Sequence, residues 1–334
     1  MKKKVLTIIV ALLAVSVLAT PLLGTVEACG FKRRNKMPGY LKDVTVTDMG
    51  TYTEYVGNLK GAGFVIRIPD DWNGMLVVGC HGWLIDVLWS NDKAQFMMDL
   101  NCTNSAGVGL PFVLVDKGFA YAASSYGSDG WAIEKGMQST LELSLYTLVL
   151  LHWQFRHCGD IKVFLVGSSM GGIIALRLGE KYPNIYDGVL AISTTVDAVW
   201  QYENLLFAIQ NLPLPPMIRA AFEKMLADIA EELGGTLEEN PEAYEKASLT
   251  NYAKIRIPVI TVYGALDPQA TPQEGIKYGL AVAEAGRSEY YRTYVAPLGG
   301  HSDGPTVDEA LIRFDELVEY PAGWPVTHKN HCWR

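Results

Sequence analysis

The chain has 334 residues, of which 49% are hydrophobic and 19% are charged, and its formal net charge is −8. A chain of this length and composition can bury a large core, which excludes a disordered or coiled-coil protein. No window gathers lysine and arginine into a stripe that could follow a phosphate backbone, so nucleic acid is excluded as a partner.

Residues 1–28 read as an export signal. Met1 is followed by three lysines, and an uncharged apolar run extends from Val5 to about Leu23. This is the order of a signal peptide, and the small residues of "VEA" before Cys29 fit a cleavage site. Two alternatives stay open: an uncleaved anchor that tethers the protein to a membrane, since the run is long enough to span one, or a lipid on Cys29. All three predict a secreted or cell-envelope protein.

The chain has five cysteines, namely Cys29, Cys80, Cys102, Cys158 and Cys332. Export permits disulfides, and an odd count leaves at least one thiol unpaired. Cys80 lies in an apolar run and is expected to be a small buried residue, so bridges are expected among the other four. The tail "HKNHCW" is too weak a pattern for a metal site, and no metal or other cofactor is expected.

From residue 45 to residue 197 the pattern alternates between strands and helices. "EYVGNL" and "GFVIRIP" predict an opening hairpin, and "MLVVGC" and "FAYAASS" predict buried strands. Apolar residues at helical spacing predict a helix between Trp131 and Arg156. "KVFLVG", "GGIIALRLGEKYP" and "DGVLAIS" then predict strand, helix and strand. This order predicts an α/β fold with a mostly parallel central sheet and helices on both faces.

The pattern breaks over residues 198–250. No buried strand is expected there, and apolar residues recur on one face of the segment from Met217 to Leu233. We therefore expect a helical lid inserted into the core. The second part of the core, residues 251–334, resumes with a strand at Ile257–Gly264, a helix near Glu274–Ala285, the strand "YYRTYVAP" and a last helix near Val307–Glu319.

The segment "FLVGSSMGGIIAL" places two serines between glycines at the junction of a predicted strand and a predicted helix. Only Ser169 is central in a G-x-S-x-G pentapeptide. Such a pentapeptide forms a sharp turn that projects the central hydroxyl above the sheet, over the positive end of the helix. Ser169 is therefore the candidate nucleophile.

A serine hydroxyl needs a base, and the base needs a carboxylate to orient it. His301, in "APLGGHSDG", follows the last predicted strand, and Asp267, in "VYGALDPQ", follows the strand before it. The order Ser169, Asp267, His301 fits a nucleophile, acid and base on successive strand ends. Asp197 is kept as an alternative acid, and Asp303 is judged too close to His301 in sequence.

Acyl transfer also requires amides that receive the negative charge on the carbonyl oxygen. The amide of Met170, directly after the nucleophile, is one candidate donor. The loop "CHGW" follows an early strand, and the N–H of Trp83 is the second candidate. His81 is expected to brace this loop.

These motifs together resemble those of an exported α/β-hydrolase, with "GSSMGG" as the nucleophile elbow, "HG" as the oxyanion loop, "GALDP" for the acid and "GGH" for the base. More narrowly, "IPDDWNGMLVVGCHGW" and "DKGFAYAASSYGSDGWAI" resemble secreted hydrolases related to feruloyl esterases and tannases. The resemblance implies an α/β-hydrolase fold and a serine esterase that acts on small or polymeric esters through an acyl-enzyme.

Aromatic residues of the predicted lid and of the "SSYGSDGW" loop are expected to line the substrate pocket. They are Tyr126, Trp131, Trp200 and Phe207. A peptidase or amidase of the same fold is the alternative function, because the chemistry is shared and the specificity lies in the pocket. An inactive binding protein is a third reading.

Overall fold

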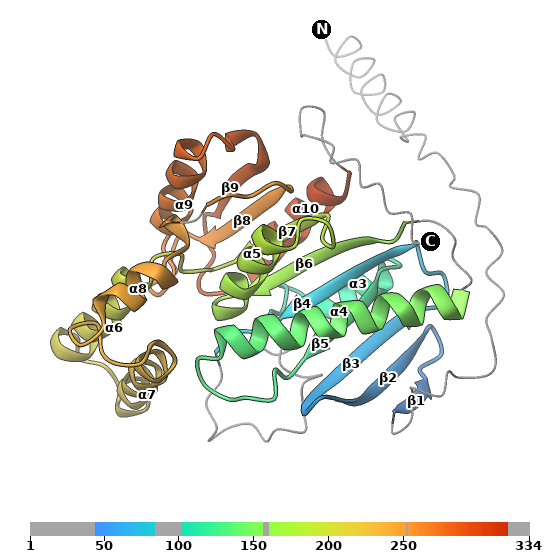
Figure 1. Cartoon of the computed structure of the whole chain (residues 1–334), viewed down its shortest axis with the longest axis horizontal. Helices are drawn as coiled ribbons and strands as arrows, with labels where there is room; N and C mark the ends of the chain where they lie inside the picture. The colour runs from blue at the N-terminus through green and yellow to red at the C-terminus, as the bar shows by residue number, and fades with distance from the viewer. Residues whose placement is uncertain (1–43, 84–101, 156–159, 252, 320–334) are drawn as a thin grey trace, which may run out of the picture.

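The computed structural model describes residues 44–83, 102–155, 160–251 and 253–319. A nine-stranded sheet with strand order β1-β2-β3-β5-β4-β6-β7-β8-β9 forms its centre. The first three strands and β5 pair antiparallel, and from β5 to β9 every pair is parallel. Figure 1 shows this sheet running through the molecule, with helices in front of it and behind it.

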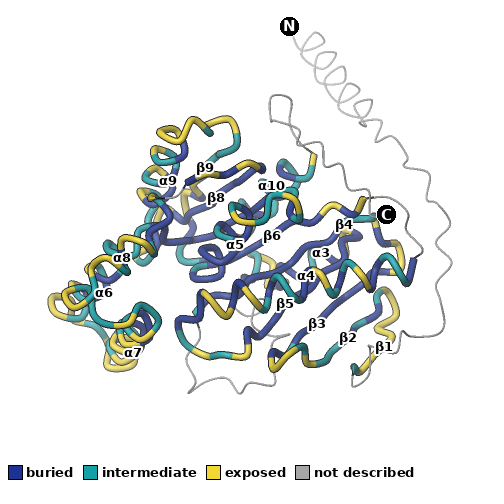
Figure 2. The backbone as a smooth tube through the Cα atoms, in the orientation of Figure 1, coloured by how far each residue is buried: buried dark blue, intermediate teal, exposed yellow. Residues whose placement is uncertain are grey.

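The strands that build the sheet are short and almost wholly buried at its centre (Figure 2). Their bounds are β1 Thr45–Asp48, β2 Tyr52–Leu59, β3 Ala62–Pro69, β4 Met75–Cys80, β5 Ala120–Ser124, β6 Lys162–Ser168, β7 Gly188–Ile192, β8 Val259–Gly264 and β9 Tyr291–Ala296. Strands covered on both faces read as continuous apolar runs, which is why β4 to β8 were visible in the sequence.

Side chains alternate along each strand between two separate cores. The larger core holds one face of the sheet together with α4 (Ile133–Phe155), α5 (Met170–Lys181) and α9 (Pro272–Glu284). The other core holds the opposite face with α3 (Leu110–Asp116) and α10 (Gly304–Glu319). Burial of both faces follows from the two-residue period of a strand and explains the layered helix–sheet–helix arrangement.

Between β7 and β8 the chain forms three helices, α6 (Ala198–Asn211), α7 (Pro216–Leu233) and α8 (Pro241–Ala247), followed by a 3-10 turn at Leu249–Asn251. We call residues 198–251 the helical insertion. Figure 1 shows it beside the end of the sheet where β6, β7 and β8 lead into their following helices. The helix predicted from Met217 to Leu233 is confirmed, since it forms most of α7.

The hairpin and the order of strands and helices predicted from the sequence are confirmed. Outside the helical insertion, one strand and one α-helix were not predicted. Strand β1 is exposed along its whole length and therefore has no apolar pattern, and α3 is only 7 residues long. Residues 1–28 and the tail "HKNHCW" lie outside the described residues, so the export signal stays a prediction.

Candidate active site

The nucleophile candidate lies at the junction of β6 and α5. Strand β6 ends at Ser168 and helix α5 begins at Met170, and Ser169 between them has φ 54° and ψ −123°. A non-glycine residue at positive φ is strained, and such strain persists only where the surrounding structure enforces it. Ser169 is half-buried, whereas both neighbours are buried. The turn therefore leaves this one hydroxyl of the segment accessible.

The glycines of the motif permit close packing around the turn. A Cβ at position 167 would overlap the carbonyl of Gly171, and a Cβ at position 171 would overlap the carbonyl of Cys80 at the end of β4. At position 172 it would overlap the hydroxyl of Thr194, beyond the end of β7. The start of α5 thus packs directly on two neighbouring strand ends, which only glycine allows.

Ser168, the other serine of the pair, is buried and has a different partner. Its hydroxyl lies 2.6 Å from that of Ser302, the residue after His301. The amide of Ser302 donates to the hydroxyl of Ser193, just after β7, at 3.0 Å. The Ser168 side chain also lowers the pKa of the buried Cys102 thiol, which offsets part of the effect of burial. Ser168 therefore connects the turn at Ser169 to the loop of His301 and is buried between them.

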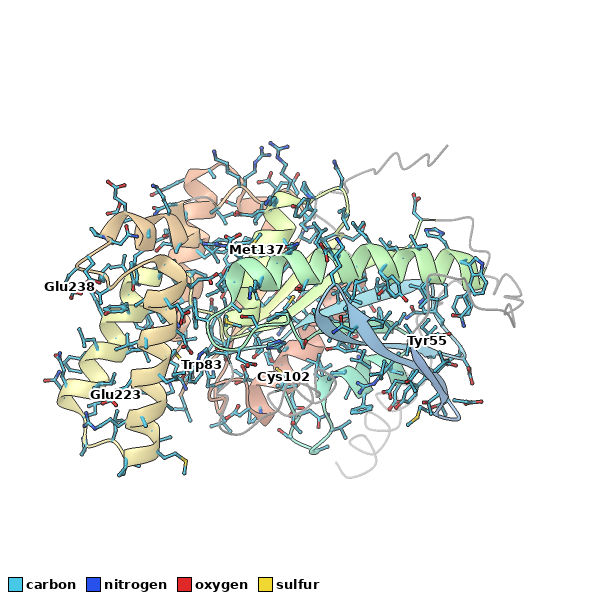
Figure 3. The ribbon with its side chains drawn as sticks, turned by 60° about the horizontal axis from the view of Figure 1, so that its bottom comes forward. Tyr55, Trp83, Cys102, Met137, Glu223 and Glu238 are labelled. Atoms are coloured by element: carbon cyan, nitrogen blue, oxygen red, sulfur yellow. The ribbon has the colours of Figure 1, made fainter. Side chains whose placement is uncertain are left out.

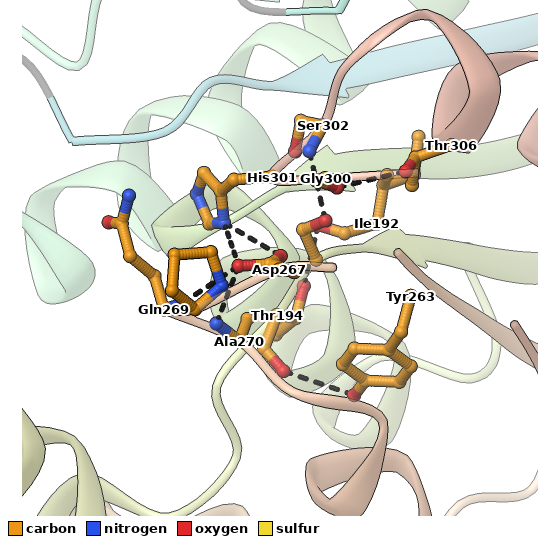
Figure 4. A network of polar contacts seen from close by, with 12 residues as sticks. Ile192, Thr194, Tyr263, Asp267, Gln269, Ala270, Gly300, His301, Ser302 and Thr306 are labelled. Atoms are coloured by element: carbon orange, nitrogen blue, oxygen red, sulfur yellow. Dashed lines mark hydrogen bonds and ion pairs between the residues drawn. The ribbon is translucent and has the colours of Figure 1, made fainter. Parts of the chain in front are cut away.

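The structure brings the candidate acid and the candidate base together. Nδ1 of His301 lies 2.9 Å from Oδ2 and 3.1 Å from Oδ1 of Asp267 (Figure 4). The Asp267 side chain is fully buried and that of His301 is 25% exposed. Oδ1 of Asp267 also accepts the amides of Gln269 and Ala270, at 2.8 and 2.9 Å. These bonds fix the carboxylate so that it can hold Nδ1 protonated and leave Nε2 as the basic nitrogen.

Opposing effects act on the pKa of Asp267. Burial raises it, but the hydrogen bond and charge of His301, together with the amides of Ala270 and Gln269, lower it to a net value below the ordinary one. Asp267 is therefore a carboxylate at neutral pH, the form that can orient and stabilise an imidazolium.

The alternative acids are engaged elsewhere. Asp197 caps α6 by accepting the amide of Trp200, and it forms an ion pair with Lys277 at 3.0 Å. Asp303 accepts the amide of Gly300 at 2.8 Å and the hydroxyl of Thr306 at 3.1 Å. Of the three aspartates considered from the sequence, Asp267 alone bonds to His301.

The backbone of Ser169 is held by the end of the neighbouring strand β7. The amide of Ser169 donates to the carbonyl of Ile192, the last residue of β7, at 2.8 Å. Within the described part of the chain, the Ser169 hydroxyl forms no hydrogen bond with His301. Hydrogen bonds between a catalytic serine and its base often tighten only in the complex with substrate.

The predicted oxyanion loop lies against the candidate nucleophile. A Cβ at Gly82 would lie 3.3 Å from Cβ of Ser169 and 3.9 Å from its hydroxyl. The amide of Met170 is at the start of α5, and Trp83 follows Gly82 directly. The two predicted donors thus belong to the two segments that meet at Ser169.

His81 is buried, and its ring stacks on Tyr126 with centroids 3.8 Å apart and planes 18° apart. Nδ1 of His81 lies 2.8 Å from the carbonyl of Gly82. The Tyr126 hydroxyl donates to the backbone carbonyl of His81 at 3.1 Å. Burial lowers the pKa of His81 to about 4, and the backbone carbonyls of Gly82 and Ser125 offset only part of this effect. His81 is therefore a neutral brace of the loop.

The four residues expected to contact substrate occupy different environments. Tyr126 is buried beneath His81, and Trp131 is buried beside α7 and lines a cavity. Trp200 is half-buried with the ammonium of Lys277 5.0 Å from its ring centre, and Phe207 is 58% exposed on α6. Of these four residues, Trp131 lines the cavity between the helical insertion and the core.

That cavity has a volume of about 120 Å³ and lies between the helical insertion and the core. Its wall combines Ile173, one turn after Ser169, with Val196 after β7 and with Ile229 and Leu233 of α7. Arg177 also reaches the wall. The lining is mostly apolar, and it begins one helical turn from the nucleophile candidate.

One prediction about the cysteines is wrong. Cys102 was expected among the bridged residues, but it is a free, buried thiol, as is Cys80. Burial raises the pKa of Cys102 to about 11, and the Ser168 side chain lowers the value only in part. The contact with Ser168 connects residues of distant segments, so no local pattern could predict it. Cys29, Cys158 and Cys332 lie outside the described residues.

Among the described residues, no helix is both long and apolar enough to cross a bilayer. The same ranges contain no group of three or more histidine, cysteine, aspartate or glutamate side chains arranged to hold a metal ion.

The sheet, its crossover helices and the strand-end placement of Ser169, Asp267 and His301 define an α/β-hydrolase fold. Residues 148–295 match the family model described as "Putative esterase". The matched range contains Ser169 and Asp267 and ends before His301. No curated protein sequence matches this chain.

The solved structures that are similar to the chain include two with this fold. One is the esterase Pf2001 of Pyrococcus furiosus, with 14% identity and a TM-score of 0.53 over 86% of this chain and 95% of that chain. The other is the acylaminoacyl peptidase of Pyrococcus horikoshii, with 12% identity and a TM-score of 0.55 over 83% of this chain. The chain spans 44% of that peptidase's length. Family model and fold together support a serine hydrolase.

Proposed function

We propose that the protein hydrolyses carboxylic esters, with Ser169 as nucleophile, His301 as general base and acid, and Asp267 as the residue that orients the imidazole. The observation that carries the proposal is the bond from His301 to the buried carboxylate of Asp267, beside a serine held at positive φ. This arrangement has the parts that an otherwise unreactive hydroxyl requires.

In the proposed reaction, Nε2 of His301 takes the Ser169 proton as Oγ attacks the ester carbonyl. The amides of Met170 and Trp83 receive the negative charge of the tetrahedral intermediate. His301 then donates its proton to the leaving alkoxide, which departs as the alcohol and leaves an acyl-serine. Water activated by the same nitrogen attacks the acyl-serine, and Ser169 recovers its proton as the acid product leaves. These steps need no cofactor.

The cavity between the insertion and the core supports a short acyl group as the preferred substrate part. Its volume is about 120 Å³, its lining is mostly apolar, and Ile173 in its wall lies one helical turn after Ser169. A peptidase that acts on free amino termini needs carboxylates beside its pocket to bind the substrate's ammonium group. Two carboxylates of α7 are already engaged with other groups, which favours an ester substrate. Asp228 contacts Lys224, and Glu232 accepts the amide of Glu134 at 2.9 Å. Secretion or attachment to the cell envelope is proposed from residues 1–28, and the proposed natural substrate is a small or polymeric ester.

The test is hydrolysis of p-nitrophenyl esters from acetate to palmitate, of methyl hydroxycinnamate and of an aminoacyl p-nitroanilide. The wild type and Ser169→Ala are compared, and a fluorophosphonate probe reports the reactive serine. We expect short esters to give the highest kcat/KM and Ser169→Ala to lose both hydrolysis and labelling. Preference for the anilide would favour a peptidase, and a folded wild type that neither hydrolyses nor labels would favour a binding protein.

A further inference from the structure

The side chain of Trp83 is held by the helical insertion. Its indole Nε1–H donates to Oδ2 of Asp228, on α7, at 2.7 Å. The two residues are 145 positions apart in the chain. Figure 3 shows Trp83 where the insertion helices meet the body of the protein. We propose that Asp228 is a positioning residue that fixes Trp83, and so fixes the amide that receives the oxyanion. This inference rests on the proposed esterase function.

The first two residues of the oxyanion loop are held by the core alone. His81 is clamped by its stacking on Tyr126 and by the hydrogen bond between its carbonyl and the Tyr126 hydroxyl. Gly82 lies so close to the nucleophile turn that a Cβ would be 3.3 Å from the carbonyl of Ser168. Trp83 differs, because its indole bond goes to the insertion. The donor residue of this loop is therefore tied to a different part of the molecule from the residues before it.

Asp228 is built into this contact. It is 6% exposed, and its carboxylate contacts the ammonium of Lys224 on the preceding turn of α7. A Cβ at Gly130 would lie 3.0 Å from Oδ2 of Asp228, so the carboxylate rests directly against the "SSYGSDGW" loop. A buried carboxylate needs hydrogen-bond donors or opposite charges, because burying an unpaired charge is energetically costly. For Asp228 these groups are the Trp83 indole and the Lys224 ammonium. The side chain thus joins α7, the loop after β5 and the loop after β4.

The consequence for catalysis comes from the geometry of an oxyanion hole. An amide stabilises the transition state only if it points at the oxygen that develops the charge, and small displacements weaken it steeply. The bond to Asp228 restrains the Trp83 indole. Through the side chain, it also restrains the Trp83 backbone and its amide. The position of α7 thereby sets how well the second amide is aimed.

The test compares Asp228→Ala, Trp83→Phe and the double variant in steady-state hydrolysis of a short p-nitrophenyl ester. Since removal of a whole donor costs about 10²- to 10³-fold in kcat, a displaced donor should cost about tenfold, with KM changed less than about threefold. The double variant should lose no more than either single variant. Asp228→Asn, which retains an oxygen acceptor for the indole, should recover most of kcat.

The matched control is Asn204→Ala. Asn204 makes a different contact between the insertion and the core, from its Nδ2 to the carbonyl of Pro268 at 3.4 Å. We expect this variant to keep the wild-type kcat. Hydrogen exchange supplies a readout without activity: a peptide covering residues 81–83 should exchange faster in Asp228→Ala and Trp83→Phe than in the wild type or Asn204→Ala, with thermal unfolding confirming that all variants fold.

The outcomes separate the two proposals. A wild type without Ser169-dependent hydrolysis overturns the esterase function, and unchanged exchange at residues 81–83 then also overturns the contact's role. An active wild type with unchanged kcat in Trp83→Phe and Asp228→Ala overturns the positioning role alone. So does a loss in Asp228→Ala that Asp228→Asn does not recover, because the bond to the indole would then not be what matters.

Discussion

The hydroxyl of Ser168 lies 2.6 Å from the hydroxyl of Ser302. Each of these serines is the chain neighbour of a candidate catalytic residue, Ser168 preceding Ser169 and Ser302 following His301. The bond therefore connects the nucleophile turn to the histidine loop from beneath, where both hydroxyls are buried. The two adjacent serines of the motif have separate tasks, one held in the core and the other left accessible.

This relationship predicts opposite effects for alanine at the two serines. Ser169→Ala should lose at least about 10³-fold in kcat with little change in stability, because it removes the proposed nucleophile. Ser168→Ala leaves the Ser302 hydroxyl without its partner in the core, and should cost about 1 to 3 kcal/mol of unfolding free energy while Ser169-dependent hydrolysis persists. Urea unfolding and ester hydrolysis measure the two effects. Loss of labelling by fluorophosphonate in folded Ser168→Ala, but not in Ser169→Ala, would contradict the assignment.

The bond between Asp267 and His301 predicts the effect of removing one charge. Asp267→Asn keeps the shape but offers an amide group to Nδ1, so the imidazole adopts the wrong tautomer. We expect kcat to fall by about 10⁴-fold with KM nearly unchanged. Asp197→Asn, which alters a carboxylate paired with Lys277, is the control and should retain activity. Equal losses of kcat in the two variants would contradict the proposed role of Asp267 in orienting His301.

The contact of Gly171 with β4 predicts a strong effect on stability. A Cβ there would overlap the backbone carbonyl of Cys80, which no side-chain rotation can relieve. Gly171→Ala should therefore lose about 3 kcal/mol or more of unfolding free energy. Gly63→Ala is the matched control, since its Cβ would meet the Ser125 hydroxyl at an ordinary 3.4 Å. Its cost should stay below about 1 kcal/mol. Chemical denaturation compares the two, and similar values would refute the packing argument.

Glu180 predicts a pH dependence of stability. Burial raises the pKa of Glu180 to about 7, and the Tyr278 hydroxyl, Lys254 and Arg177 offset only part of this effect. Between its ordinary value of 4.5 and about 7 the folded chain binds a proton there that the unfolded chain releases, so this group lowers stability as pH rises through that window.

Glu180→Gln removes this effect and can still accept the Tyr278 hydroxyl. The variant should gain on the order of 1 to 3 kcal/mol relative to the wild type at pH 8, and little at pH 4.5. The half-buried position of the carboxyl keeps the expected gain in this range. Thermal unfolding at both pH values measures it. A difference between variant and wild type that is the same at pH 4.5 and pH 8 would contradict the shift.

Local patterns in the sequence were sufficient for most of the architecture. The apolar runs of β4 to β8 and the helical spacing in α4 and α7 are consequences of burial on one or both faces, so they can be read residue by residue. The G-x-S-x-G pentapeptide and the strand-end positions of Asp267 and His301 likewise follow from chain order in a parallel sheet. Strand β1 and helix α3 were not predicted, because exposed or very short elements show too little apolar periodicity.

Only the tertiary structure decided which side chains meet. Asp197 and Asp267 both follow strands, and the sequence favours one without excluding the other until the bond to His301 is seen. The pairing of Ser168 with Ser302 and that of Trp83 with Asp228 join positions 134 and 145 residues apart. Such contacts depend on how the helices and loops pack around the sheet. Periodicity reports which face a residue buries, whereas its partner on that face is set by the three-dimensional arrangement of distant segments.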